Sequence, residues 1–549
     1  MKSTRTMTLF SKTLLCASAM ALSASAGNAD HQFDLTSWLL DLNVDGSKEN
    51  IVDIGLKIVS SVTTKSEDFL KDFPDAKASA HPYFNFMPMW RASMIPDTNV
   101  KSTWSASCFP ENTGHVKTEA DGSLTVHVVA SGEKSSASCY DHYALLTNTG
   151  FKTVTLDEAG ETSFTWTLPA DITAAEQWDL NTKGIRLMEF MTSVETSAAN
   201  LVETASLFVA ELTKHVPKHA AERNVDFMST YPKMNMESRD PLSHLPPPAH
   251  RVHSGDFFGV IRLDGLDPML AWGMGSTTGH TTMAQWIDGE LYICESTVTD
   301  SYWPTNGIQK TPYATWLKQA QEAGYNVVHA PLNAAYRAKY NSSAAIEFFN
   351  ENEGLDYGFQ NMLWGWIDTL YENYPCVPDD YSSVCLQWEL VESLFAVIDR
   401  SIPEISDLMW NPAWNKRIGT DGLSTSDIYY HAMTQLDIDS RVIPTIPEQD
   451  SWVYNTTRNG EPAVGKSMVC CVFVCNMWKA SGMFGDIDFN CAEMTNSDDY
   501  QLRIFEEEYQ QIMGQWTLNF NEYNSKDPFD HMRESCASLP PDYAKSDHC

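Results

Sequence analysis

The feature that most constrains this chain is a short apolar segment that begins with two adjacent cysteines, Cys470 and Cys471. Val474, Met477 and Trp478 follow Cys470 at helical spacing, which predicts a buried helix with Cys470 in its first turn. Backbone N–H groups and the positive end of the helix dipole favour a thiolate at that position. The segment therefore predicts a nucleophilic cysteine, although a disulfide partner or a small core residue would fit the same pattern.

A histidine far upstream lies in a segment that is predicted to form a β-hairpin. Asp-Gly at 288–289 stands between two apolar-rich runs and is a strong signal for a two-residue turn. Side chains alternate between the faces of a strand, so this turn puts His280 and Glu295 on one face and Glu290 on the other. A thiol, an imidazole and a carboxylate are the parts of an activated cysteine, and we therefore predict Cys470, His280 and Glu295 as catalytic residues.

Four motifs, in order along the chain, carry a resemblance to a known family. They are Ser254-Gly255-Asp256-Phe257-Phe258, Thr278-Gly279-His280, Gly354-Leu355-Asp356-Tyr357-Gly358-Phe359 and Cys470-Cys471-Val472-Phe473-Val474. The last resembles the C-S-x-F-V box of NlpC-type papain-fold hydrolases. Histidine before cysteine resembles the circularly permuted branch, which includes YiiX-like hydrolases and the lecithin:retinol acyltransferase group. The resemblance covers roughly residues 250–485 and implies a papain-like domain of antiparallel sheet plus helices.

The chain departs from the family pattern in three places. Cys471 stands where the family has serine, so the motif register favours Cys470 as the nucleophile and leaves Cys471 or Cys475 as a disulfide or packing residue. Gly358 stands where the G-x-x-Y-D element has aspartate. The interval from Gly354 to Cys470 is long for a compact permuted domain, which predicts a helical insertion.

Charge and the first residues indicate the setting. Residues 1–26 have basic residues, a short apolar run and a small-residue cleavage site, which is typical of a secretory signal peptide. A formal net charge of −35 at pH 7 argues against an unassisted binder of nucleic acid or anionic membranes. No later segment has the length and apolar character of a transmembrane helix. We expect a secreted protein or one in a lysosome- or vacuole-like compartment.

Cysteine usage agrees with export. The chain has 12 cysteines, and Cys16 lies in the signal segment, so an odd number remains and at least one thiol has no internal partner. A free nucleophile would explain that odd number. The expected pairings are Cys108 with Cys139, Cys376 with Cys385, and a staple of the tail through Cys536 or Cys549.

A length of 549 residues predicts two or three domains, and the family resemblance implies an α+β fold. The predicted parts are a signal peptide (1–26), a mixed helix and β-rich N-terminal domain (27–244), a Pro-rich linker (245–252), a permuted papain-like domain with a helical insertion (253–485), and a helical, disulfide-stapled C-terminal extension (486–549). Alternating polarity predicts strands at 124–129 and 162–167, whereas 172–216 and 497–513 are predicted to be largely helical.

The function predicted from these features is hydrolysis of an amide bond, such as that of a peptide or a cell-wall peptide. Cys470 would attack the carbonyl, His280 would transfer the proton, and Glu295 would orient His280. One alternative is a thiol acyltransferase or lipid acyl hydrolase of the same fold. Another is a non-catalytic secreted binding glycoprotein, since Asn341 and Asn455 begin N-glycosylation tripeptides. No cofactor and no metal site are expected.

Overall fold

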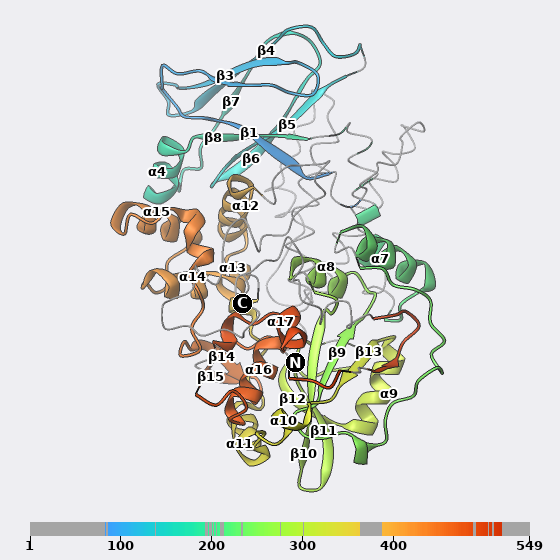
Figure 1. The fold of residues 1–549 in the computed structure, drawn as a ribbon. Coiled ribbons are helices and arrows are strands. Elements are labelled where there is room, and N and C mark those ends of the chain that lie inside the picture. The colour runs from blue at the N-terminus through green and yellow to red at the C-terminus, as the bar shows by residue number, and fades with distance from the viewer. Residues whose placement is uncertain are drawn as a thin grey trace.

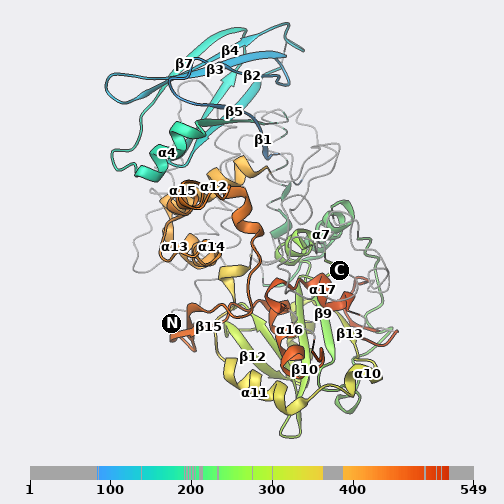
Figure 2. The same cartoon turned by 60° about the vertical axis from the view of Figure 1, so that its left-hand side comes forward.

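The computed structural model describes most of residues 83–518. The exceptions are residues 84–85, 138, 232–233, 275, 300, 363–386, 487–489, 503 and 508–509, and most of 191–213. The predicted signal peptide, the Cys376–Cys385 pairing and the staple through Cys536 or Cys549 lie outside the described residues. Figures 1 and 2 show an elongated arrangement, with a β-rich part at one end, a larger sheet with helices at the other, and a helical part between them.

The β-rich end is a sandwich of two antiparallel four-stranded sheets, ordered β1-β8-β5-β6 and β2-β3-β4-β7. Its strands are β1 (Pro88–Met94), β2 (Ser102–Trp104), β3 (Glu111–Thr118), β4 (Leu124–Ser131), β5 (Asp141–Thr147), β6 (Gly150–Leu156), β7 (Gly160–Trp166) and β8 (Ile185–Phe190). Buried side chains from both sheets form one core, in which the Trp104 indole N–H donates to the Tyr143 hydroxyl at 3.1 Å. The predicted strands at 124–129 and 162–167 are confirmed as parts of β4 and β7.

Two expectations about this end have different outcomes. The predicted disulfide between Cys108 and Cys139 is confirmed, with a Cα–Cα distance of 5.6 Å. The prediction of helix from 172 to 216 is wrong in part, because α4 (Ala174–Thr182) is followed by strand β8. Every residue of β8 is buried, so its sequence shows no alternation of polar and apolar residues, and the contacts within the sheet outweigh the helix propensity of Leu, Met and Glu.

The other end is built on one antiparallel sheet of six strands, ordered β12-β11-β10-β9-β13-β16. The strands are β9 (Phe257–Ile261), β10 (His280–Ile287), β11 (Glu290–Thr297), β12 (Gly307–Pro312), β13 (Asn326–Ala330) and β16 (Gln510–Met513). Helix α16 (Cys470–Ala480) packs on one face and α9 (Tyr313–Ala323) on the other, each over its own apolar core. The other helices at this end are α7 (Lys218–Thr230), α8 (Leu266–Gly273), α10 (Ala334–Arg337), α11 (Ser342–Asn352) and α17 (Asn496–Gln501). Helices together with antiparallel sheets confirm the predicted α+β class.

Helices make up much of the described part of the interval between Gly354 and Cys470, as predicted. They are α12 (Trp388–Ser401), α13 (Pro403–Met409), α14 (Asn411–Ile418) and α15 (Thr425–Gln435), followed by the hairpin of β14 (Tyr454–Arg458) and β15 (Glu461–Gly465). Their aromatic core also includes Tyr357, Phe359 and Met362, which come from the segment before the insertion. The insertion thus shares its core with the chain that leads to the active-site region.

A buried charge cluster joins the sandwich to the insertion, where α12 and α15 lie beneath the sandwich in Figure 1. Arg186 of β8 donates to both carboxylate oxygens of Asp179, at 2.9 and 2.8 Å, and to Glu392 of α12 at 2.9 Å. Lys183 also pairs with Glu392. Burial alone would raise the pKa of Glu392, but the charges of Lys183 and Arg186 lower it to about 2. The carboxylate is therefore ionised and held between cations from the other part of the chain.

The segments at the predicted domain boundaries pack against the neighbouring helices and cores. Val252, in the predicted linker, is buried in the core beneath α9, and its carbonyl accepts from the Trp286 indole at 2.8 Å. Helix α7, which the sequence assigned to the N-terminal domain, packs on α8 through Phe227 and Trp272. The predicted helix at 497–513, and with it a helical extension, is wrong in part: α17 ends at Gln501, and 510–513 form strand β16, which pairs with β13.

Candidate active site

Cys470 is the first residue of α16, as predicted from the apolar spacing. Val469 is the N-cap and makes no side-chain capping hydrogen bond, so the first N–H groups of the helix remain available near the thiol. Cys470 and Cys471 are 4% and 2% exposed. Further along the helix, Cys475 forms a disulfide with Cys491. Of the two cysteines that the sequence left as disulfide or packing residues, Cys475 is the one in a disulfide, whereas Cys471 is a buried free thiol.

The predicted hairpin brings His280 and Glu295 together. Asp288 and Gly289 have φ angles of 50° and 84°, both in the left-handed region that a tight two-residue turn requires. Trp286 then pairs with Leu291, in the predicted register. The His280 Nε2 lies 2.9 Å from Glu295 Oε2, and the other oxygen, Oε1, accepts from the Trp316 indole of α9 at 3.2 Å.

Because Glu295 occupies Nε2, the Nδ1 of His280 is the nitrogen left to interact with the thiol. His280 is the first residue of β10, at the end of the strand, where its ring meets the start of α16. Burial alone would lower the pKa of His280, but hydrogen bonds to Cys470 and Glu295 and their charges raise it to about 10. The imidazole is therefore a stable cation beside the sulfur.

The environment of Cys470 favours the thiolate. The largest influence is a hydrogen bond from the Cys471 side chain, which lowers the pKa of Cys470; burial opposes it, and His280 and the Thr281 N–H lower it further. The pKa of Cys470 lies well below its ordinary value as a result. Burial and the neighbouring thiolate raise the pKa of Cys471, so Cys471 keeps its proton and acts as the donor. Together these shifts favour a thiolate–imidazolium pair.

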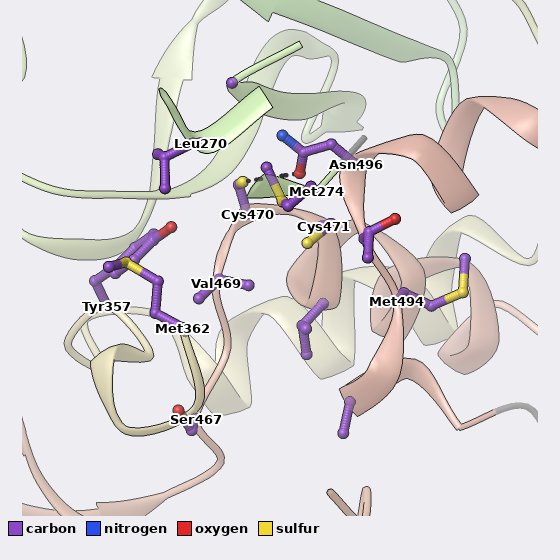
Figure 3. Close-up of a pocket in the computed structure, with 14 residues that line it drawn as sticks. Leu270, Met274, Tyr357, Met362, Ser467, Val469, Cys470, Cys471, Met494 and Asn496 are labelled. Carbon is purple, nitrogen blue, oxygen red and sulfur yellow. Dashed lines mark hydrogen bonds between the residues drawn. The ribbon is translucent and has the colours of Figure 1, made fainter. Parts of the chain in front are cut away.

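Three further polar residues surround the thiol, and sequence reasoning gave none of them a role. The Cys470 sulfur lies 3.4 Å from Asn496 Oδ1, the contact drawn in Figure 3, and the Asn496 amide N–H donates to the Thr278 carbonyl at 3.2 Å. The hydroxyl of Tyr357 interacts with both the thiol and the backbone N–H of Cys470. The carboxyl of Asp499 is fully buried, and burial, followed by the charge of Cys470, raises its pKa well above the ordinary value.

Glycine at 358 explains how Tyr357 reaches Cys470. A Cβ on Gly358 would lie 2.3 Å from the backbone nitrogen of Met468, two residues before the nucleophile, and the Gly358 N–H donates to the Met468 carbonyl at 3.1 Å. Aspartate, the residue of the family element, would clash at this close approach of two backbones. The departure from the family pattern is thus tied to how this chain brings Tyr357 and Cys470 together.

Two hollows meet at the thiol and the imidazole. One is lined by Cys470 and Cys471 and by apolar side chains. Figure 3 shows these apolar residues arranged around the sulfur atoms: Leu270, Met274, Met362, Val469 and Met494. The other lies on the His280 side and has a polar wall of Arg262, Asp264, Asp267 and Thr297. A reacting carbonyl at Cys470 would therefore have apolar surroundings on one side and polar surroundings on the other.

Asp267 lies close to His280 because residue 279 is glycine. A Cβ on Gly279 would lie 2.4 Å from the Cβ of Asp267. Burial and the nearby charge of Asp264 raise the pKa of Asp267 to about 8. This carboxyl therefore changes its charge near neutral pH, within the wall of the second hollow.

Comparison with known proteins leaves the family resemblance untested. No family model, no curated protein and no solved structure matches this chain. Among the residues that the structure describes, no helix is long and apolar enough to cross a membrane. The functional argument therefore depends on the chemistry of the site.

Proposed function

We propose that this chain is a secreted or lysosome-like cysteine hydrolase that cleaves amide bonds. The observation that carries the proposal is the meeting of Cys470, at the start of a helix, with a buried imidazole that a carboxylate orients. A thiolate that is stable near neutral pH next to an imidazolium supplies both the nucleophile and the acid that amide cleavage needs. The resemblance to permuted NlpC-type hydrolases supports the same reading.

In the proposed mechanism, the Cys470 thiolate attacks the carbonyl carbon and the electron pair moves to the carbonyl oxygen. The Tyr357 hydroxyl, which interacts with the thiol and the N–H of Cys470, would donate to that oxyanion. His280 gives its Nδ1 proton to the leaving nitrogen, and an acyl-enzyme remains. His280, now neutral, takes a proton from water, which attacks the acyl carbon and releases Cys470.

The apolar hollow gives specific support to an alternative, a thiol acyltransferase or lipid acyl hydrolase of the same fold. Leu270, Met274 and Met494 would stabilise a hydrocarbon group next to the attacked carbonyl, with methionines adapting to its shape. The two activities share Cys470 and His280 and differ only in the leaving atom. A peptide or cell-wall amide remains the main proposal, because an imidazolium acid is needed more for an amine than for an alkoxide leaving group.

Thiol labelling followed by a substrate screen tests the proposal. Iodoacetamide should alkylate Cys470 at a pH well below the ordinary thiol pKa, and an inactive His280→Gln variant should lose that reactivity. The labelled chain should then be compared with the unlabelled chain on matched amide and ester libraries. Hydrolysis that labelling blocks supports the enzyme, and amide or ester preference decides between the two activities. An unreactive Cys470 would instead support the non-catalytic binding glycoprotein.

A further inference from the structure

Two free thiols lie side by side at the start of α16, and both open to the same hollow. Cys470 and Cys471 are adjacent in the chain, are unpaired, and line the same hollow. The Cys471 side chain donates a hydrogen bond to the Cys470 sulfur. The hollow is partly open and has room for a water-sized molecule, so a small oxidant can reach the thiols, whereas the near-complete burial of both residues shields them from large molecules.

The same helix shows that this pair differs from the other cysteines. Cys475 is already joined to Cys491, and Cys108 is joined to Cys139, so the chain supports disulfides wherever the geometry suits them. Their Cα atoms lie 5.4 and 5.6 Å apart. Consecutive residues are only about 3.8 Å apart, below the usual range, so a bond between Cys470 and Cys471 would be strained and easily reduced.

From this arrangement we infer that Cys470 and Cys471 form an oxidation site, at which a peroxide converts them to a reversible vicinal disulfide that masks the nucleophile. The role as an off switch depends on the proposed function, whereas the oxidation chemistry does not. Strained disulfides have high reduction potentials and are the labile, regulatory ones. The first turn of α16 has to rearrange to form the bond, and its N-cap Val469 has no side-chain hydrogen bond that would prevent this.

The chemistry balances with a peroxide as the oxidant. The Cys470 thiolate attacks one peroxide oxygen, the O–O bond breaks, and the departing hydroxide takes a proton to become water, leaving a sulfenic acid. The Cys471 sulfur then attacks the Cys470 sulfur, the S–O bond breaks, and the second hydroxide leaves as water with the Cys471 proton. One peroxide molecule thus accepts the two electrons of the new S–S bond. Two molecules of a thiol reductant return these electrons and leave as their own disulfide.

Cys471 is the resolving thiol by position. Cys294, the third free cysteine of the described residues, is buried within β11, in the core beneath α16, and lines neither hollow. Burial raises its pKa well above the ordinary value, which makes it unreactive. Without Cys471, a sulfenic acid at Cys470 would lose the thiol that hydrogen-bonds to it and would pass to the irreversible sulfinic acid.

The test compares the full-length chain with Cys471→Ser and, as a matched control, Cys294→Ser. Each is exposed to hydrogen peroxide and divided into portions with and without dithiothreitol. Both portions are labelled with iodoacetamide, and the mass of the peptide that contains Cys470 is measured by mass spectrometry. The unaltered chain and Cys294→Ser should lose two hydrogen atoms from this peptide and regain labelling with dithiothreitol. In Cys471→Ser, this peptide should gain oxygen atoms instead. The labelling that dithiothreitol restores should be about tenfold lower than in the unaltered chain.

Two results would overturn the inference. One is recovery of labelling in Cys471→Ser as complete as in the unaltered chain, and the other is a peptide of the unaltered chain that gains oxygen rather than losing hydrogen. Cys471→Ala repeats the test if the serine variant does not fold. Mass and labelling need no turnover, so the two proposals fail separately: a chain that forms the disulfide but hydrolyses nothing contradicts the function alone.

Discussion

Strand β4 of the sandwich and strand β10 of the six-stranded sheet have the same length but bury their residues differently. In β4, buried and half-buried residues alternate from Leu124 to Ser131. In β10, the first six residues are all buried, and they begin with His280, Thr281 and Thr282. An alternating strand needs its buried side chains only for packing, whereas polar residues buried on both faces of a strand are costly unless they serve a purpose. Strand β4 therefore serves packing, whereas β10 carries buried polar residues at the candidate site.

The largest expected effect separates chemistry from stability at Cys470. Cys470→Ala should lower turnover by a factor on the order of 10⁴ or more, because in the described part of the chain Cys470 is the thiol that interacts with His280. The melting temperature should change little, since a nucleophile contributes reactivity more than packing. Steady-state kinetics on the best substrate and a thermal melt measure the two quantities. Retained turnover would show that Cys470 is not the nucleophile.

The reverse separation is expected in the sandwich. Leu145 of β5 is fully buried, and Leu145→Ala should lower the free energy of unfolding by about 2–5 kcal/mol through the cavity it leaves. Iodoacetamide labelling of Cys470 should keep its rate under native conditions. Denaturant unfolding monitored by tryptophan fluorescence reports the stability. A marked drop in the labelling rate would mean that the two sheets are not independent in function.

Two carboxylates of one hairpin, Glu295 and Glu290, are expected to differ in their effect on turnover. Glu295→Gln should lower turnover roughly tenfold to a hundredfold, because a neutral amide still holds the His280 ring but stabilises its cation less. Glu290→Gln, the matched control, changes an exposed residue that accepts a hydrogen bond from Tyr292 and should have little effect. Initial rates of both purified variants, compared with the unaltered chain, measure the two effects. A larger loss with Glu290→Gln would contradict the assignment.

The pH dependence follows from the charges of the pair. Turnover should rise with pH as Cys470 loses its proton, at a pH well below the ordinary thiol value, and should fall as His280 loses its proton near its pKa of about 10. Replacing His280 by Gln removes the cation, so labelling of Cys470 at mildly acidic pH should fall about tenfold. Labelling rates measured across the pH range test this. An unchanged profile would exclude His280 as the cation that stabilises the thiolate.

The smallest expected effect concerns a buried hydroxyl of β10. Thr282 is fully buried, and its hydroxyl has no hydrogen-bond partner in the described part of the chain. Thr282→Val keeps the shape and removes the unsatisfied group, which should stabilise the chain by about 1 kcal/mol. Denaturant unfolding measures the gain. Destabilisation would indicate that the hydroxyl has a partner, such as an ordered water, that Val cannot replace.

Local signals predicted much of the fold and the centre of the site. The turn at 288–289 fixes the register that brings Glu295 to His280, and the apolar spacing after Cys470 fixes the start of α16. Both are short-range relations, in which residue type and period determine which face a side chain takes. The alternating strands of the sandwich were predictable for the same reason.

The remaining residues of the site could not be found in this way. Asn496 and Asp499 follow the disulfide that joins Cys475 to Cys491, and Tyr357 precedes the helical insertion, so only tertiary contacts bring them to the thiol. Asn496 has no local pattern that would distinguish it from a surface asparagine. Strand β16 was missed because Gln510–Met513 is a short strand without clear alternation, and its pairing with β13 outweighs its local preference.

The buried cluster of Arg186, Asp179 and Glu392 has a consequence for how the protein can be divided. Cutting the chain between the sandwich and the six-stranded sheet would leave Glu392 buried on α12 without Arg186 or Lys183. Stranding one member of a buried ion pair costs about 3–5 kcal/mol, a large part of the stability of an ordinary domain. A fragment that carries only the half with the thiol and the imidazole would therefore be less stable than the whole chain. The same cost would oppose joining the half that holds Cys470 and His280 to other proteins.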